Sequence, residues 1–286
     1  MPGTMNKNLT EIAFILDRSG SMAPVTEAAI TGFNVFLRDQ QKTEGQARLT
    51  LVLFDNEYLV PLDCIPVQEA VSLDTIVGYG PEPGECVRIA RKKFLGCVVG
   101  NHEAMLRYSP SNKDCDEQWE SVGQALKIAM KQLGDSEDMA WLRRLPVVIE
   151  EDGMMLVHSS PYRPGSFTYI HNYEDAKASF QCQGAELVFY GHTHVPAVWK
   201  MRGKRIQCSS PGEDLIRLKP GTRYMINVGS VGQPRDDDPR ACYVIYDPEK
   251  KVIRFRRIPY DIKTAQDRFY AACLPSRNSL RLAQGQ

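Results

Sequence analysis

The chain has 286 residues, which is enough for one large domain or two domains of ordinary size. Its 35 basic residues balance its 35 acidic residues, so no net charge attracts nucleic acid or a membrane surface, and no apolar run approaches a membrane span. The eight scattered cysteines form no C-x-x-C pair and the first residues lack the apolar core of a signal peptide, so we expect a soluble cytoplasmic protein with reduced thiols.

The first part of the chain predicts a strand, a helix and two further strands. Residues 11–17 (EIAFILD) form an apolar run that ends in Asp17. The apolar face of residues 24–40 predicts an amphipathic helix. Two strand-like runs follow at 47–55 and 57–67, separated by a tight turn. This order is typical of a β-α-β-β segment.

From residue 76 onward the pattern is α/β at first and then increasingly antiparallel β. A Gly/Pro-rich loop leads into the start of a helix, and further helices are expected at 116–134, 136–143, 173–183 and 262–273. Strands are expected at 95–100, in a hairpin over 145–159, and at 186–190, 195–201, 204–209, 222–230, 240–247 and 250–260. We therefore expect sheets packed face to face with helices outside.

Four of the five histidines fall within three short motifs. These are GNHE at 100–103, VHS at 157–159 and GHTH at 191–194, and each closes an apolar run. Imidazoles and an Asn carbonyl at strand ends suit a borderline divalent ion such as Mn, Fe or Zn. The fifth histidine, His171, is interpreted as a structural residue. The pattern predicts a metal site assembled from separate strand ends.

These motifs, in this order, resemble those of the calcineurin-like metallophosphoesterases, and especially their small bacterial and archaeal cytoplasmic branch. Two further stretches extend the resemblance, IVGYGP at 76–81 and INVGSVGQPR at 226–235. The resemblance covers residues 76–286 and implies an αββα sandwich. It also implies a two-metal hydrolase of small phosphomonoesters or phosphodiesters.

The resemblance also implies roles for the histidine motifs. Asn101, His158 and His192 resemble three ligands of one metal, and His194 resembles a ligand of the other. His102 corresponds to the residue that contacts the phosphate and assists the leaving group, with Glu103 orienting it. The cofactors implied are one or two divalent ions, Mn, Fe, Zn or Ni. Such ions polarise phosphoryl oxygens and supply a bound hydroxide.

The chain departs from that family at the start of the resemblance. The family has an amino-terminal Asp-x-His and a bridging Asp directly before the GYGP stretch. This chain has Thr75 at the bridging position, with Asp74 one residue away, and no Asp-x-His before residue 76. A slip of one residue in an extended segment turns a side chain to the other face. We therefore expect an incomplete dinuclear site with weak or impaired activity.

Residues 8–74 resemble the first half of another family, the von Willebrand factor A domains, which are Rossmann-like. Asp17, Ser19 and Ser21 match the D-x-S-x-S pattern that helps to hold one Mg²⁺ through hard oxygen ligands. The plain alternative is a turn that caps the following helix. The predicted division is a partial domain at 1–75 and a metallophosphoesterase domain at 76–286. Such a chimera-like join indicates a recombination, an engineered joining or a sequence-assembly product.

The two parts could also cooperate, with the first strands replacing the missing β-α-β unit. Asp17 and Asp55 would then supply the absent carboxylates. Two rival functions stay open: a Mg²⁺-dependent binding module of the A-domain type, and a catalytically inactive hybrid scaffold. Four loop residues could line a phosphate pocket or be ordinary surface residues, namely Tyr79, Tyr162, Arg163 and Arg235.

Overall fold

The computed structural model describes residues 9–17, 46–54, 58–62, 70–71, 77–108, 120–212 and 215–286. The chain divides into two compact units, Met1–Ala70 and Val71–Gln286. In the first unit only strand backbones are described. No helix in these described stretches is long and apolar enough to cross a bilayer.

The first unit holds a three-stranded sheet in the order β1-β2-β3. β1 (Leu9–Asp17) pairs in parallel with β2 (Gln46–Phe54) along its whole length. β3 (Tyr58–Leu62) returns antiparallel to β2 and is shorter than the predicted run at 57–67. Asp17 is the last residue of β1. The predicted helix at 24–40 lies outside the described residues.

The second unit contains two sheets, one of six strands and one of four. The six-stranded sheet has the order β5-β6-β7-β11-β8-β9, with β6, β7 and β11 parallel and the outer strands antiparallel. Its strands are β5 (Val148–Glu151), β6 (Met154–Val157), β7 (Leu187–Tyr190), β8 (Ala197–Arg202), β9 (Arg205–Ser209) and β11 (Arg223–Asn227). The four-stranded sheet has the order β10-β13-β12-β4. Its strands are β4 (Ala70–Val71), β10 (Ile216–Arg217), β12 (Ala241–Asp247) and β13 (Val252–Ile258).

The main core lies between the two sheets. Alternate residues of β12 are buried, as a strand with one covered face requires. Val244 and Phe255 from one sheet belong to the same apolar cluster as Phe189 and Ile226 from the other. The predicted packing of sheets face to face is confirmed.

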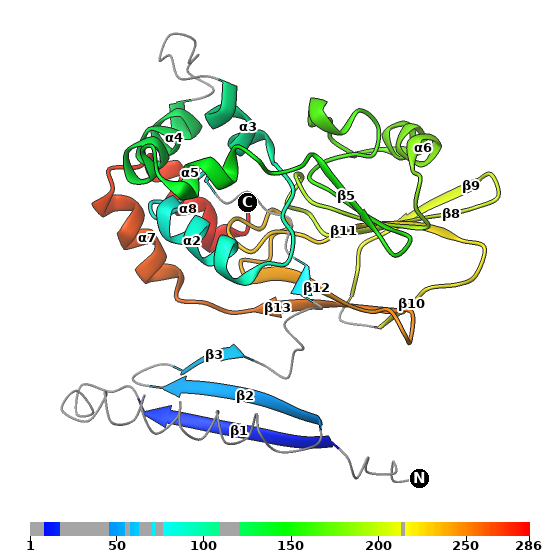
Figure 1. Cartoon of the computed structure of the whole chain (residues 1–286), viewed down its shortest axis with the longest axis horizontal. Coiled ribbons are helices and arrows are strands. Elements are labelled where there is room, and N and C mark those ends of the chain that lie inside the picture. Colours follow the sequence, from blue (N-terminus) through cyan, green and yellow to red (C-terminus); the bar gives the residue numbers. More distant parts are fainter. Residues whose placement is uncertain are drawn as a thin grey trace. The chain divides into compact units, whose positions relative to one another are not determined.

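Helices cover the sheets and fill one end of the unit (Figure 1). They are α2 (Pro83–Lys93), α3 (Asn101–Tyr108), α4 (Glu120–Leu133), α5 (Glu137–Leu142), α6 (Tyr173–Cys182), α7 (Ile262–Ala271) and α8 (Ser276–Gln284). Phe180 of α6 packs against Val188 and Met225 on the other face of the six-stranded sheet. Phe269 and Leu282 from α7 and α8 pack against Ala125 of α4. The fold is therefore mixed α/β, as predicted.

One predicted strand is wrong. Residues 95–100 form an extended segment outside the sheet ladders, where Val99 N–H donates to the Pro146 carbonyl at 2.8 Å. The sequence of this segment resembles a buried strand because both valines are in the core. Val98 packs between the sheets, and Val99 packs among the helices. The two side chains are thus buried on opposite sides of the segment, although its backbone does not pair with a neighbouring strand in the described part of the chain. Helices α3 and α8 are further features that the sequence pattern did not reveal.

Candidate metal centre

Three side chains predicted to share one metal lie together. His158 follows β6, His192 follows β7, and Asn101 begins α3. His158 Nε2 lies 3.0 Å from Asn101 Oδ1 and 3.1 Å from His192 Nδ1. β6 and β7 are parallel neighbours, so their carboxyl ends reach the same edge of the sheet. A hydrogen bond from Gly191 N–H to the His158 carbonyl (2.9 Å) joins the two ends.

The spacing and chemistry of these atoms fit a borderline divalent cation. Ligand atoms about 2.1 Å from a metal lie about 3 Å apart when they are mutually at right angles. Burial lowers the pKa of His192 to about 4, against the opposing effect of a hydrogen bond with the Phe167 backbone. The neutral imidazole is the form that binds metals. Within the described stretches no group of three or more His, Cys, Asp or Glu side chains could hold a metal, and here the third donor is an amide.

His194 lies against the Tyr79 ring, as does His102. Its Nδ1 donates to the Gln233 carbonyl at 2.7 Å, because a carbonyl oxygen can only accept. This bond leaves Nε2 as the nitrogen with a lone pair, which is the usual arrangement for a ligating histidine. The Tyr79 ring lies edge-on to both histidines, with centroids 4.8 Å from His102 and 6.1 Å from His194. Both histidines are buried.

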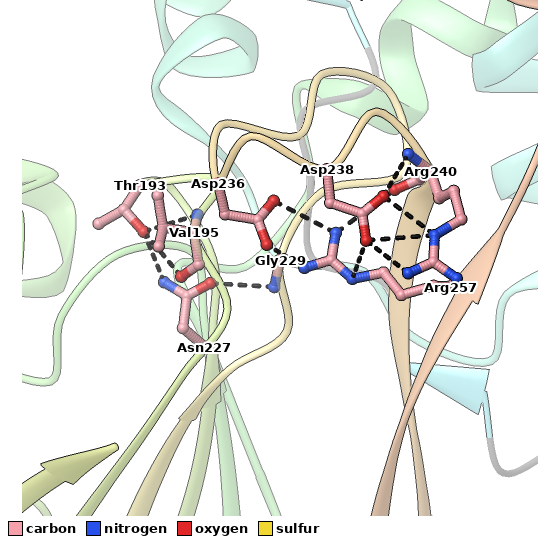
Figure 2. A network of polar contacts seen from close by, with 8 residues as sticks. All are labelled: Thr193, Val195, Asn227, Gly229, Asp236, Asp238, Arg240 and Arg257. Carbon is pink, nitrogen blue, oxygen red and sulfur yellow. Dashed lines mark hydrogen bonds and ion pairs between the residues drawn. The ribbon is translucent and has the colours of Figure 1, made fainter. Parts of the chain in front are cut away.

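The loop that carries two of these histidines has an unusual backbone. His192 and His194 have φ values of 66° and 62°, in the left-handed region that non-glycine residues seldom adopt. Asn227 holds this loop, since its Nδ2 donates to the Gly191 carbonyl at 2.8 Å. The same nitrogen donates to Thr193 Oγ1 at 2.9 Å (Figure 2). Strain of this kind persists where the surroundings over-determine it, and it is common at functional sites.

The side-chain amide of Asn227 also forms a hydrogen bond through its oxygen atom. Asn227 Oδ1 accepts from Gly229 N–H at 3.0 Å, and Asn227 itself is fully buried (Figure 2). Gly229 has φ 77°, and a Cβ atom there would lie 2.6 Å from Cys242 Sγ. The Asn227 side chain therefore joins the 191–193 loop to the segment that follows β11. Its place in the 226–235 stretch was visible in the sequence, but its contacts were not.

Glu103 fixes the backbone around the first motif. Its buried carboxylate accepts from Val77 N–H (3.1 Å) and from Gly100 N–H (3.0 Å). A Cβ at Gly100 would lie 2.6 Å from Glu103 Oε2 and 3.1 Å from the His158 ring, so only glycine fits. These bonds place Asn101 at the start of α3. The expected role of Glu103 in orienting His102 stays a prediction.

Arg235 brings a positive charge next to the buried histidines. Its Nη2 donates to Gln233 Oε1 (2.6 Å) and to Tyr79 Oη (3.1 Å), and its Cζ lies 5.5 Å from the centroid of the Tyr79 ring. Its backbone N–H donates to the His194 carbonyl at 3.1 Å. Two of the four loop residues considered for a phosphate pocket, Tyr79 and Arg235, thus lie in contact. The guanidinium is a suitable group for phosphate oxygens.

The sequence pattern missed one aromatic neighbour of the metal centre. Tyr169 stacks on His192, with ring centroids 4.0 Å apart and an interplanar angle of 19°. His171 stacks on the same tyrosine, at 4.9 Å and 13°. Tyr162 and Arg163 contact each other, with Arg163 Cζ 5.3 Å from the ring centroid. An aromatic stack has no signature in the order of residues along a loop.

The remaining candidate ligands belong to the first 75 residues. Asp17 is described only as the last backbone position of β1. Four others lie outside the described residues, namely Ser19, Ser21, Asp55 and Asp74. A Mg²⁺ site at the D-x-S-x-S turn, and the supply of carboxylates by Asp17 or Asp55, stay predictions.

Comparison with known proteins agrees with this arrangement. Residues 62–251 match the model of the calcineurin-like phosphoesterase superfamily domain. An uncharacterized protein of Methanocaldococcus jannaschii is 32% identical over 225 residues, which cover 77% of this chain and 88% of that protein. The family match begins within the segment that resembles a von Willebrand factor A domain.

Solved structures resemble nearly the whole chain. The crystal structure of a metallophosphoesterase from Sphaerobacter thermophilus superposes with a TM-score of 0.64 at 28% identity, over 96% of this chain and 98% of that one. A hypothetical protein from Pyrococcus horikoshii OT3 has a TM-score of 0.58 at 16% identity, over 97% and 99% of the two chains. The second likeness concerns the fold alone.

Proposed function

The chain belongs to the calcineurin-like phosphoesterase superfamily, whose members are metal-dependent phosphoester hydrolases, and we propose that its histidine centre hydrolyses small phosphoesters weakly. The observation that carries this proposal is that His158 Nε2 lies within 3.0 Å of Asn101 Oδ1 and 3.1 Å of His192 Nδ1. Three neutral donors around one point are suited to a divalent ion such as Mn²⁺ or Zn²⁺.

Each neighbouring residue has a role in this proposal. Asn101, His158 and His192 would hold a divalent ion, which would supply Lewis-acid polarisation of the phosphoryl group. Arg235 binds the phosphoryl oxygens through its guanidinium, and Tyr79 orients that guanidinium through the hydrogen bond to its hydroxyl. His102, whose ring lies against Tyr79, gives a proton to the leaving oxygen. Tyr169 covers one face of the His192 ring and limits access of water to it.

The proposed weakness follows from the missing carboxylates. Thr75 stands where the family pattern has its bridging Asp, and a threonine hydroxyl cannot neutralise two cations. We therefore propose one tightly held ion at Asn101, His158 and His192, and a second ion near His194 that is bound weakly. Loss of groups that merely support metal ligands lowers affinity or activity about 10- to 100-fold, and loss of a ligand lowers it further.

The direct test is hydrolysis of bis(p-nitrophenyl) phosphate and p-nitrophenyl phosphate by the purified chain with Mn²⁺ or Zn²⁺. We expect slow, metal-dependent release of p-nitrophenol that His192→Ala abolishes. The matched control is Lys204→Gln, an exposed change in the turn after β8, which should leave the rate unchanged. Absence of hydrolysis with every divalent metal would favour the inactive hybrid scaffold.

A second measurement separates metal binding from turnover. Isothermal titration of the metal-free protein with Zn²⁺ should give about one tight site, and His158→Ala should remove it. Tyr173→Ala, which changes an exposed residue of α6, serves as the control. Two equally tight sites would show that other residues replace the missing carboxylates.

The alternative of a Mg²⁺-binding module rests on the first unit. We propose that residues 8–74 form the front half of a von Willebrand factor A fold, and the support is the parallel pairing of β1 with β2 and the antiparallel return of β3. In that case Asp17→Ala should abolish Mg²⁺ binding while hydrolysis at the histidine centre continues. Loss of hydrolysis in Asp17→Ala would instead connect this residue with catalysis.

A further inference from the structure

A cavity of about 400 Å³ lies along β8 and β9, on the face that carries Val198, Lys200 and Arg202. Asn227 pairs with Ala197 next to the histidines, whereas Arg223 pairs with Met201 near the cavity. Val198 brings one wall of the cavity close to Ala197, whereas the cation Arg202 lies five residues further along β8, or about 16 Å. The cavity is within the size range of small-molecule sites. It is lined by β8, β9, β10 and their connecting loops, and none of the histidines contributes to it.

The cavity is strongly basic. Its lining includes five cationic side chains, which are Lys200, Arg202, Arg205, Arg217 and Lys219. Its described lining contains no Asp or Glu. Glu213 and Asp214 follow in the connecting loop and lie outside the described residues. The lining that the structure describes is therefore positive.

Strand geometry places these cations together. Lys200 and Arg202 lie two residues apart on β8 and therefore share one face, while Trp199 of the same strand packs into the core on the other face. Arg205 of β9 is paired directly with Arg202 across the hairpin. Like charges in directly opposed positions destabilise a β-ladder. A bound anion would remove this repulsion.

The cationic groups are available for a ligand. None of the five forms an ion pair with another residue among those the structure describes. The backbone N–H of Lys219 donates to Tyr224 Oη at 3.1 Å, which fixes the start of that side chain at the wall. Gln207 and Ser209 add neutral polar groups to the lining. Tyr224 is the sole aromatic residue in the described lining, and it is buried, so a base would find no exposed ring on which to stack.

We propose that this cavity binds an oligophosphate anion, either free or as the phosphate tail of a nucleotide, independently of the histidine centre. Several closely spaced negative charges match several closely spaced cations, whereas a single phosphate would neutralise only part of the charge. Arginines on two neighbouring strands can contact phosphate oxygens in pairs. Recognition is through phosphate rather than through a base.

The test is isothermal titration of the full chain with sodium tripolyphosphate in the presence of EDTA. Wild type should bind, and Arg205→Gln or Arg217→Gln should each weaken the affinity roughly threefold to tenfold. The double variant should weaken it further, while Arg205→Lys should retain most of it. These residues are exposed, so the variants should fold, and circular dichroism checks this.

Matched controls define the outcomes that would overturn the proposal. Arg254→Gln changes an exposed arginine of β13 outside the cavity and should leave affinity unchanged. Equal weakening by Arg254→Gln and Arg205→Gln would show diffuse attraction to the surface. Loss of binding in His192→Ala, with none in the cavity variants, would place the probe at the histidine centre. Either result, or no binding by wild type, overturns the proposal.

A comparison of ligands separates the two sources of phosphate. ATP should bind no more tightly than tripolyphosphate, and adenosine should not bind. Equal affinity for both phosphates supports recognition of the phosphate chain itself. Adenosine binding as tightly as ATP would overturn the proposal, because recognition would then depend on the base. Hydrolysis by Arg205→Gln should equal that of wild type, so failure of this site leaves the proposed phosphoesterase activity untouched.

Discussion

Two loops shown in Figure 2 are held by different kinds of interaction. The loop at 191–195, which carries two histidines, is held by the neutral, fully buried amide of Asn227. The loop at 236–240 is held by ion pairs between its acidic residues and Arg257, whose side chain is 13% exposed. The first loop has left-handed backbone at both histidines and the second has it at Asp237.

The difference indicates how each loop responds to its surroundings. Neutral hydrogen bonds away from water are insensitive to salt and to pH near neutrality, but each unpaired partner costs about 1–3 kcal/mol. Ion pairs that are partly exposed are screened by salt and respond to pH. We infer that the geometry of the metal centre should be constant over a range of conditions in which the second loop weakens.

The largest expected effect comes from Asn227→Ala. It leaves the Gly191 carbonyl, Thr193 Oγ1 and Gly229 N–H without this partner, so the free energy of unfolding should fall by about 3–4 kcal/mol. Hydrolysis should fall about 100-fold, because the strained histidine loop can relax. Urea unfolding and phosphodiesterase assays measure the two effects.

Asn278 provides the matched control for that prediction. It is 1% exposed, and its side-chain nitrogen and oxygen have no hydrogen-bond partner in the part of the chain that the structure describes. Asn278→Ala should therefore cost less stability and leave hydrolysis unchanged. If the two variants lose equal stability, the Asn227 hydrogen bonds are not what holds the loop.

The second prediction concerns Arg257→Met, which keeps the length of the side chain and removes its charge. Asp236 and Asp238 both lose an ion-pair partner, and the free energy of unfolding should fall by about 1–2 kcal/mol. Arg254→Met on the exposed face of the same strand should change it by less than about 0.5 kcal/mol. Hydrolysis should stay within a few-fold of wild type. A loss of activity as large as that of Asn227→Ala would contradict the separation of the two loops.

Much of this arrangement could be predicted from the sequence. Short apolar runs before His158 and His192 placed both residues at strand ends, and the structure brings His158 into contact with His192 and Asn101. Strand-like runs separated by Gly, Pro or Asp turns likewise predicted most strands of both sheets. These features depend on local pattern, and local pattern is what a sequence displays directly.

Other features depend on contacts between distant segments. Asn227 holds a loop more than 30 residues earlier in the chain, and Tyr169 stacks on His192 from another loop. The extended segment at 95–100 looks like a strand because it is buried on two sides, although no ladder forms. Lys200 and Arg202 show strand alternation in the sequence, but the wall formed by β10 is known only from the fold.

A smaller effect is expected from acid. Asp238 accepts hydrogen bonds from Arg240, and these hold the pKa of Asp238 below its ordinary value. The positive charge of Arg257 lowers this pKa further. Because the folded-state pKa is depressed, the charged Asp238 stabilises the protein above its unfolded pKa of about 4, and this contribution disappears as the pH falls through the folded pKa. The difference in unfolding free energy between wild type and Asp238→Asn should therefore be largest near pH 7 and shrink below pH ~4. A difference that is constant from pH 7 to pH 3 would show that this carboxylate is not stabilised by its arginines.

The smallest effect should come from salt, and it distinguishes the two loops most directly. Raising the ionic strength from about 0.1 to 1 M shortens the screening length from about 10 to 3 Å. The stability difference between wild type and Arg257→Met should then shrink by about 0.5 kcal/mol, because the pair is only partly shielded from solvent. The corresponding difference for Asn227→Ala should not change, since neither partner is charged. General effects of salt on folding cancel because each value is a difference from wild type at the same salt concentration. Equal sensitivity of the two differences would mean that the histidine loop also depends on charge, and that the neutral hydrogen bonds alone do not hold its left-handed backbone.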